Sequence, residues 1–171
     1  MTSFSKLFLL GILAFALSCK QEKKQETTPP AAQNGQTAAA PAQATGPEVP
    51  GIPEMVMVKL LNECTFVDYI FKDLPFSLSQ NEDPSIDQNI SYIDINRPVG
   101  KLPTNCKATA RKFFQIKGEI VYDVDVYLGQ GCNYYVFVDK TNKPVYANYI
   151  TADGVKFYMN VISQAVGSIK Q

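Results

Sequence analysis

The sequence contains no histidine among its 171 residues. Histidine is the side chain best suited to proton transfer near neutral pH and the commonest metal ligand, so its absence excludes Ser-His and Cys-His catalytic pairs. There is no CxxC motif, and thus no support for a thioredoxin-like redox site or a zinc knuckle. The only glycine-rich stretch, Gly129-Gln130-Gly131, is better explained as a hairpin turn than as a phosphate loop. We therefore expect a protein that is not an enzyme and that uses no cofactor or metal.

Clustered charge and long apolar runs are also scarce. Lys and Arg together number 16, as do Asp and Glu, and no basic cluster suits nucleic acid or anionic lipid. The one long apolar run, Leu7–Leu17, is too short to span a bilayer stably. Lys6 precedes this run and small or polar residues follow it. This order is typical of a secretory signal peptide, which we assign to residues 1–18.

Four residues at the end of this segment, Ala16-Leu17-Ser18-Cys19, resemble the lipobox of bacterial lipoproteins, in a loose form similar to that of spirochaetal lipoproteins. The resemblance implies a diacylglyceryl thioether on Cys19 and an acylated α-amino group, with chains such as palmitate. Two or three acyl chains give stable membrane anchoring. The alternative is an ordinary secretory signal that happens to contain a cysteine. Lys20 is not the Asp that retains enterobacterial lipoproteins at the inner membrane, which favours the outer membrane of the cell envelope.

The mature chain is predicted to divide into two parts. Residues 19–50 are rich in Gln, Ala, Pro, Thr, Lys and Glu, with no aromatic residue and no Val, Ile or Leu before Val49. Such a segment buries too little apolar surface to offset the entropy of ordering, so we interpret it as a lipid-anchored disordered tether. Residues 51–171 have the usual size of one globular domain.

The domain is predicted to begin with a helix. Pro53 and Glu54 suit a first turn, and apolar residues recur at three- and four-residue spacing until Pro75. These residues are Met57, Leu60, Leu61, Cys64, Val67 and Phe71. Residues 74–105 read as a long loop with one strand at 90–95, and a loop of that length is either functional or conceals an element.

From residue 108 onward the apolar period becomes two, which indicates strands. The predicted strands are 110–117, 119–128, 132–138 and 145–150. Short connections make successive strands antiparallel neighbours. A closing helix follows Thr151, a suitable N-cap. The expected fold class is α+β: an N-terminal helix, a four- to five-stranded antiparallel meander sheet and a C-terminal helix packed on the sheet.

Three cysteines remain for the domain once Cys19 is lipidated. An exported domain lies in an oxidising compartment, where three cysteines allow one disulfide and one leftover thiol. We favour Cys106–Cys132, because both residues fall at the same end of the predicted sheet. Cys64–Cys106 is the rival pairing. In the favoured case Cys64 is left as a small buried side chain on the first helix.

One face of the predicted sheet carries the candidate functional residues. Its aromatic side chains and two carboxylates are Tyr127, Tyr135, Phe137, Tyr146, Asp123 and Asp125. Either a helix covers this face, or it forms an exposed aromatic binding surface. The two carboxylates are close enough to share a cation or act as an acid/base pair, but a solvated sheet face explains them more simply, and two carboxylates make a poor calcium site.

These observations predict a lipid-anchored envelope lipoprotein with a non-enzymatic domain. Its expected partners are the membrane, through the anchor, and a protein or envelope component bound by the sheet face or the long loop. The alternative is a periplasmic inhibitor or chaperone-like accessory of an envelope enzyme, which would insert the 74–105 loop. A hydrolase that uses Asp123 and Asp125 ranks last.

Overall fold

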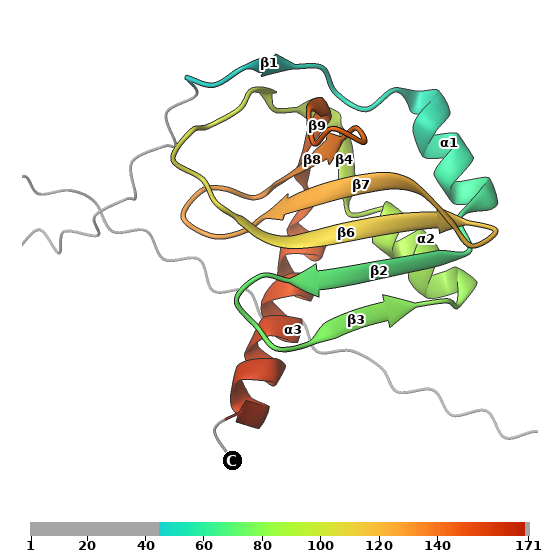
Figure 1. Cartoon of the computed structure of the whole chain (residues 1–171), viewed down its shortest axis with the longest axis vertical. Helices are drawn as coiled ribbons and strands as arrows, with labels where there is room; N and C mark the ends of the chain where they lie inside the picture. Colours follow the sequence, from blue (N-terminus) through green and yellow to red (C-terminus); the bar gives the residue numbers. More distant parts are fainter. Residues whose placement is uncertain (1–44, 170–171) are drawn as a thin grey trace, which may run out of the picture. The chain divides into compact units, whose positions relative to one another are not determined.

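The computed structural model describes residues 45–169, which form an α+β domain with three helices and a seven-stranded antiparallel sheet (Figure 1). The predicted signal peptide, the predicted lipidation site Cys19 and most of the predicted tether lie outside the described residues. The elements are β1 (Glu48–Val49), α1 (Glu54–Glu63), β2 (Phe66–Phe71), β3 (Ser77–Gln80), α2 (Asp83–Ile90), β4 (Ile93–Pro98), β5 (Gly100–Lys101), β6 (Ala108–Ile116), β7 (Glu119–Tyr127), β8 (Tyr134–Val138), β9 (Pro144–Ile150) and α3 (Ala152–Ile169). None of the helices among them is long and apolar enough to cross a membrane.

The antiparallel meander is confirmed. Strands β6, β7, β8 and β9 pair in succession, each antiparallel to the next. Lys117 and Gly118 join β6 to β7 with positive φ angles of 52° and 84°, as a tight hairpin turn of the favoured hand requires. The predicted size of four to five strands is wrong, because the sheet runs β3-β2-β6-β7-β8-β9-β4 and a separate ribbon pairs β1 with β5.

The first predicted helix is too long. Helix α1 begins at Glu54, directly after Pro53, but ends at Glu63, and the residues after Thr65 form strand β2. Val67 and Phe71 are four residues apart, so they fit the period of a helix as well as that of a strand. The buried Tyr69 between them fits only the strand, because Val67, Tyr69 and Phe71 alternate with more exposed residues.

The segment 74–105 is built into the fold rather than forming a long free loop. It contains β3, α2, β4 and β5, and the predicted strand at 90–95 corresponds to β4 at Ile93–Pro98. Helix α2 has a proline in its first turn, where the missing N–H is tolerated. Ile86 and Ile90 of α2 are almost completely buried in the main core. The sequence signal was weak because a helix of eight residues shows barely two turns of periodicity.

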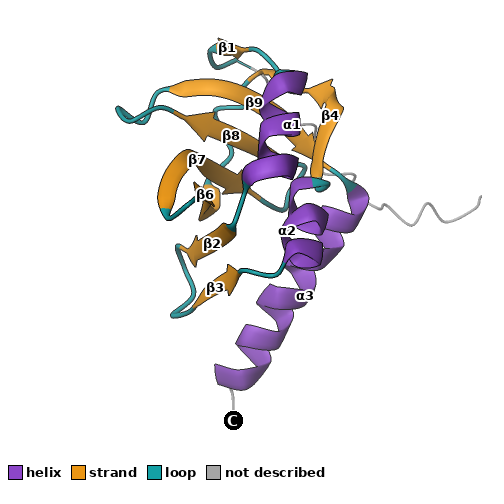
Figure 2. Ribbon diagram, turned by 90° about the vertical axis from the view of Figure 1, so that its right-hand side faces the viewer, coloured by secondary structure: helices purple, strands orange, loops and turns teal. Residues whose placement is uncertain are grey.

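All three helices contribute to one hydrophobic core on one face of the sheet (Figure 2). The C-terminal helix is capped as predicted, since the Thr151 hydroxyl oxygen accepts a hydrogen bond from the Gly154 N–H at 3.3 Å. On the opposite face a second, smaller core lies over β8 and β9, where Val49 of β1 and Leu102, directly after β5, pack with Tyr134 and Val136. This ribbon begins before residue 51, inside the segment predicted to be tether.

Candidate functional site

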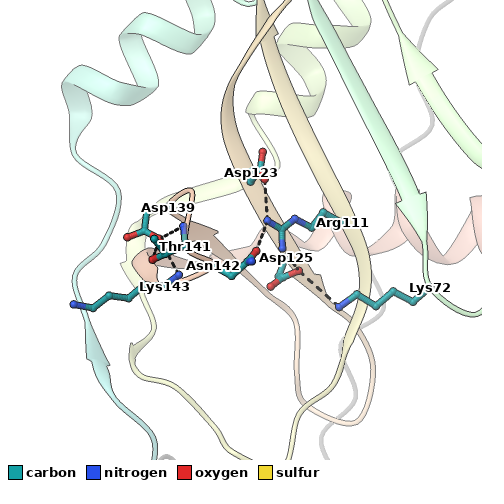
Figure 3. A network of polar contacts seen from close by, with 8 residues as sticks. All are labelled: Lys72, Arg111, Asp123, Asp125, Asp139, Thr141, Asn142 and Lys143. Carbon is teal, nitrogen blue, oxygen red and sulfur yellow. Dashed lines mark hydrogen bonds and ion pairs between the residues drawn. The ribbon is translucent and has the colours of Figure 1, made fainter.

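A network of four charged side chains lies on the face of the sheet that carries no helix. At its centre, Arg111 of β6 places Nη2 2.8 Å from the Asp123 carboxylate and Nη1 3.6 Å from that of Asp125 (Figure 3). The ammonium group of Lys72 lies 3.7 Å from the Asp125 carboxylate. The two cations therefore balance the two carboxylates. The sequence analysis favoured a simple solvated face for these carboxylates, whereas in the structure both lie beside one cation, an arginine of this chain.

The register of the β6–β7 hairpin brings this network together. Pairing from the Lys117-Gly118 turn places Arg111 directly opposite Asp125 and Phe113 opposite Asp123. The sequence analysis did not identify Arg111 or Lys72. Counting back from the turn in regular register would have placed Arg111 opposite Val124 and away from the two aspartates. The irregularity between Phe114 and Gln115 shifts the pairing by one residue, and opposite residues in an antiparallel pair share a face. Lys72 follows the strand that was misread as a helix.

The turn between β8 and β9 supports the network from one side. Asn142, at a positive φ of 62°, accepts a hydrogen bond from Arg111 Nη2 through its side-chain oxygen at 2.8 Å. Asp139 shapes this turn by accepting hydrogen bonds from the Thr141 hydroxyl and from the N–H groups of Thr141 and Lys143 (Figure 3). These bonds hold the pKa of the Asp139 carboxyl below its usual range. Arg111 is thus held by two carboxylates of β7 and by the β8–β9 turn.

Apolar side chains border the network. Ile70 of β2 lies directly opposite Arg111 in the register and is 50% exposed, and Phe113 of β6 is half-buried on the same face. Asp68 and Ser79 extend this face toward β3, where the Ser79 hydroxyl donates a hydrogen bond to the Asp68 carboxylate. Within residues 45–169 no group of three His, Cys, Asp or Glu side chains could hold a metal ion. The surface thus offers one arginine, carboxylates and exposed apolar groups.

The predicted aromatic surface does not exist as one surface. Tyr135 and Phe137 are fully buried on the helix-covered face, and the Tyr135 hydroxyl lies 3.0 Å from that of Tyr158 in α3. Tyr146 meets Phe137 edge-on on the same side. The alternative of helix cover is therefore confirmed for β8, and Tyr135 and Phe137 are wrong as exposed binding residues. Tyr127 lies on the other face, with its ring stacked on that of Tyr134 at 4.6 Å.

The error has a physical cause in strand β8. All five of its residues are buried, because the main core covers one face and the β1–β5 ribbon covers part of the other. A strand buried on both faces shows no alternation of polar and apolar residues, so the sequence does not predict which side chains point to which face of the sheet. The register pairs Tyr127 with Tyr134 and Val126 with Tyr135, which separates the tyrosines between the two faces.

The predicted disulfide, Cys106–Cys132, is confirmed, with the two Cα atoms 6.0 Å apart. It borders a hollow of about 520 Å³, lined also by Asp73, Thr109 and Gln130. Cys64 is a free thiol, as predicted, but it follows α1 rather than lying on its buried face. Partial burial raises the pKa of this thiol, which lowers its reactivity near neutral pH.

A buried lysine is the residue that the sequence analysis missed most completely. Lys112 of β6 is fully buried beneath the helices, with Nζ 4.3 Å from the ring centre of Phe114 and 4.8 Å from that of Tyr135. Nζ donates one long hydrogen bond, of 3.4 Å, to the carbonyl oxygen of Asn89. Burial lowers the pKa of this amine far below its usual range. Among the described residues no carboxylate forms a salt bridge with it, so we assign it to the core and not to the site.

The comparisons with known proteins identify no relative. No family model, no curated protein and no solved structure matches this chain. The function must therefore be inferred from the geometry of the sheet face itself.

Proposed function

We propose that this protein is a lipid-anchored lipoprotein of the bacterial cell envelope, at the outer membrane, and that its domain binds a protein partner without catalysis. The binding surface is the helix-free face of β3, β2, β6 and β7 around Arg111, hereafter the Arg111 face. One observation carries the proposal: the β1–β5 ribbon covers the β8–β9 half of this side of the sheet, whereas the β3–β2–β6–β7 half has no covering element among residues 45–169.

The chemistry of the Arg111 face supports protein binding. Arginine and aromatic side chains are enriched where protein interfaces have their strongest contacts, with charged groups around them. Arg111 is already fixed by Asp123 and Asn142, at 2.8 Å each, so a partner would not have to order it on binding. Ile70 and Phe113 supply apolar area that a partner would remove from water.

A matched pair of variants tests this surface in the full chain. Ile70 on the Arg111 face and Leu61 on helix α1 are apolar and nearly equally exposed, at 50% and 48%. Ile70→Glu should remove bound proteins from a tagged sample isolated from envelope extract, whereas Leu61→Glu should retain them. Both variants should melt like the native chain, since neither side chain is buried. Recovery of the same proteins with both variants would rule out the Arg111 face.

The lipid anchor is tested separately at Cys19. The thioether requires the cysteine sulfur, so Cys19→Ser should abolish labelling by a fatty-acid analogue. It should also move the protein from the detergent phase to the aqueous phase on phase separation. Equal labelling of the native chain and the variant would contradict lipidation at this residue. The folded domain lies downstream of the change, so its melting temperature serves as the control.

A further inference from the structure

The two edges of the seven-stranded sheet differ in how they are protected. Natural sheets block unwanted strand pairing with proline, charge or irregular register at an edge. Strand β4, at one edge, contains Arg97 and Pro98, and its register with β9 is irregular. Strand β3, at the other edge, pairs with β2 in unbroken register and contains no charged residue or proline among its four residues. Among the described residues β3 has a partner on one side only.

Helix α3 extends past the β3 edge, as both views of the ribbon show (Figures 1 and 2). The sequence from Phe157 to Ile169 contains no charged residue. Met159 and Val166 in this part of the helix are 48% and 36% exposed. An open strand edge and an uncharged helix with exposed apolar side chains thus lie at the same end of the domain. Their occupant should be an extended, uncharged segment with an apolar side.

Strand β3 and the residue before it, Phe76-Ser77-Leu78-Ser79-Gln80, meet that description themselves. Leu78 faces the helices, since it pairs with the buried Tyr69, while Ser77 and Ser79 face the opposite side. Two copies can pair antiparallel about a two-fold axis at Leu78 with every side chain on its correct face. Because Ser-Leu-Ser reads the same in both directions, leucine then meets leucine and serine meets serine. The proline-rich tether of the chain itself is a poorer occupant, because proline lacks the N–H that strand pairing needs.

We propose that the β3 edge is a homodimer interface in which two copies of this chain form one continuous antiparallel sheet. Leu78 then lies opposite the partner's Leu78, and Ser77 opposite the partner's Ser79. No like charges meet across the strands, and helix α3 extends past the same edge. The interface is isologous, as in most dimers. The proposal is independent of the partner that binds the Arg111 face, but it would present two such faces on one side of one sheet.

Charge substitution at the two exposed serines tests the register. The first variant, Ser77→Lys with Ser79→Lys, places lysines opposite lysines across the axis. The second, Ser77→Glu with Ser79→Lys, places glutamates opposite lysines. Position 79 is identical in both variants and lies opposite Asp68 within its own chain. Within one chain the variants therefore differ only at position 77, which lies opposite the uncharged Ile70. Between copies, the charge at position 77 meets the lysine at position 79 of the partner.

Sedimentation equilibrium of the chain from residue 19 onward, with Cys19→Ser, provides the measurement, since both hydrophobic cores lie within residues 45–169. The native sequence and the Glu/Lys variant should be dimers, and the Lys/Lys variant should dissociate at least tenfold more readily. A native chain that is monomeric at every concentration would overturn the proposal and leave the edge to a strand of another protein. The same oligomeric state in both variants would overturn it too.

A crosslink at the axis gives a second, independent measurement in intact cells. Cβ atoms of directly opposite residues lie about 5 Å apart, so Leu78→Cys should form a disulfide-linked dimer under mild oxidation. Val58→Cys, on the exposed side of α1, is the control. Both are made with Cys64→Ser, so that no other free thiol of the described residues takes part. Equal crosslinking at the two positions, or none at Leu78→Cys, would refute pairing about Leu78.

Discussion

Replacement of the buried lysine by methionine should stabilise the domain at neutral pH. Lys112 lies in an interior of aromatic rings with a single long hydrogen bond, to the carbonyl oxygen of Asn89. Methionine is unbranched, of similar length and adaptable in packing, so Lys112→Met keeps the core filled. The change removes an amine that must lose its hydration for the domain to fold.

The magnitude follows from the poor compensation of this amine. Burying a polar group without good hydrogen bonds costs about 1–3 kcal/mol in protein mutational data. The variant leaves the Asn89 carbonyl without its hydrogen-bond donor, and this loss offsets the stabilisation by about 1 kcal/mol at most. We therefore expect Lys112→Met to raise the free energy of unfolding by about 1–2 kcal/mol at pH 7. The corresponding rise in Tm is roughly 4 °C per kcal/mol for a domain of this size.

The sign of the pH dependence provides a sharper test. The pKa of Lys112 is lowered in the fold, so between that pKa and about 10.4 the unfolded chain binds a proton that the folded chain does not. The free energy of unfolding should therefore rise with pH in the native chain, by up to about 1.4 kcal/mol per pH unit, and this rise should be absent in Lys112→Met.

Other titrating groups around Lys112 act in the opposite direction and are shared by both proteins. Burial raises the pKa of the Cys64 thiol and of the Tyr69, Tyr135 and Tyr158 hydroxyls, so these groups stabilise the fold at low pH and lose that effect as pH rises. Urea unfolding of both proteins at pH 7 and pH 9 isolates the lysine. A variant less stable than the native chain at both values would show that the aromatic rings stabilise a charged ammonium, and would refute the reasoning.

The remaining predictions concern the fold around the site. Cys132→Ala should lower the free energy of unfolding by about 3 kcal/mol, as the loop-entropy estimate gives, and reductant should no longer affect its melting. Gly154→Ala should destabilise the domain despite alanine's higher helix propensity, because the new Cβ would lie 2.7 Å from a Tyr92 carbon. Gly167→Ala has open space around it and should raise the free energy of unfolding by about 0.5–1 kcal/mol. Arg111→Met should reduce stability by about 1 kcal/mol, because two carboxylates lose their main partner; equal melting temperatures for the native chain and this variant would contradict the network.

The sequence predicted the elements whose period was unambiguous. The β6–β9 meander, the Thr151 cap and the disulfide follow from alternation, a capping residue and cysteine placement. It failed where one pattern fits two structures, as with Val67 and Phe71 in β2. The prediction also failed in β8. Burial on both faces of that strand removes the polar–apolar alternation that indicates which side chains point to which face of the sheet.

The candidate site was predictable only in part. Asp123 and Asp125 were identified from the alternation of β7, and both belong to the network on the Arg111 face. Their cation partners come from strands whose register had to be known first. Lys112 offered no signal, because a lysine in an alternating strand is ordinarily assumed to face water. Three-dimensional pairing, and not composition, distinguishes the partly exposed Arg111 on the helix-free face from its fully buried neighbour Lys112.

The central claim, that the Arg111 face binds a protein partner, is tested most directly by photo-crosslinking in living cells. A photoreactive amino acid would replace Ile70 on this face or Leu61 on helix α1, two positions of matched exposure. We predict one discrete adduct at position 70 and none at position 61, and the adduct should be lost when Arg111→Glu reverses the central charge. Equal adducts at both positions, or an adduct at position 70 that survives Arg111→Glu, would contradict the account.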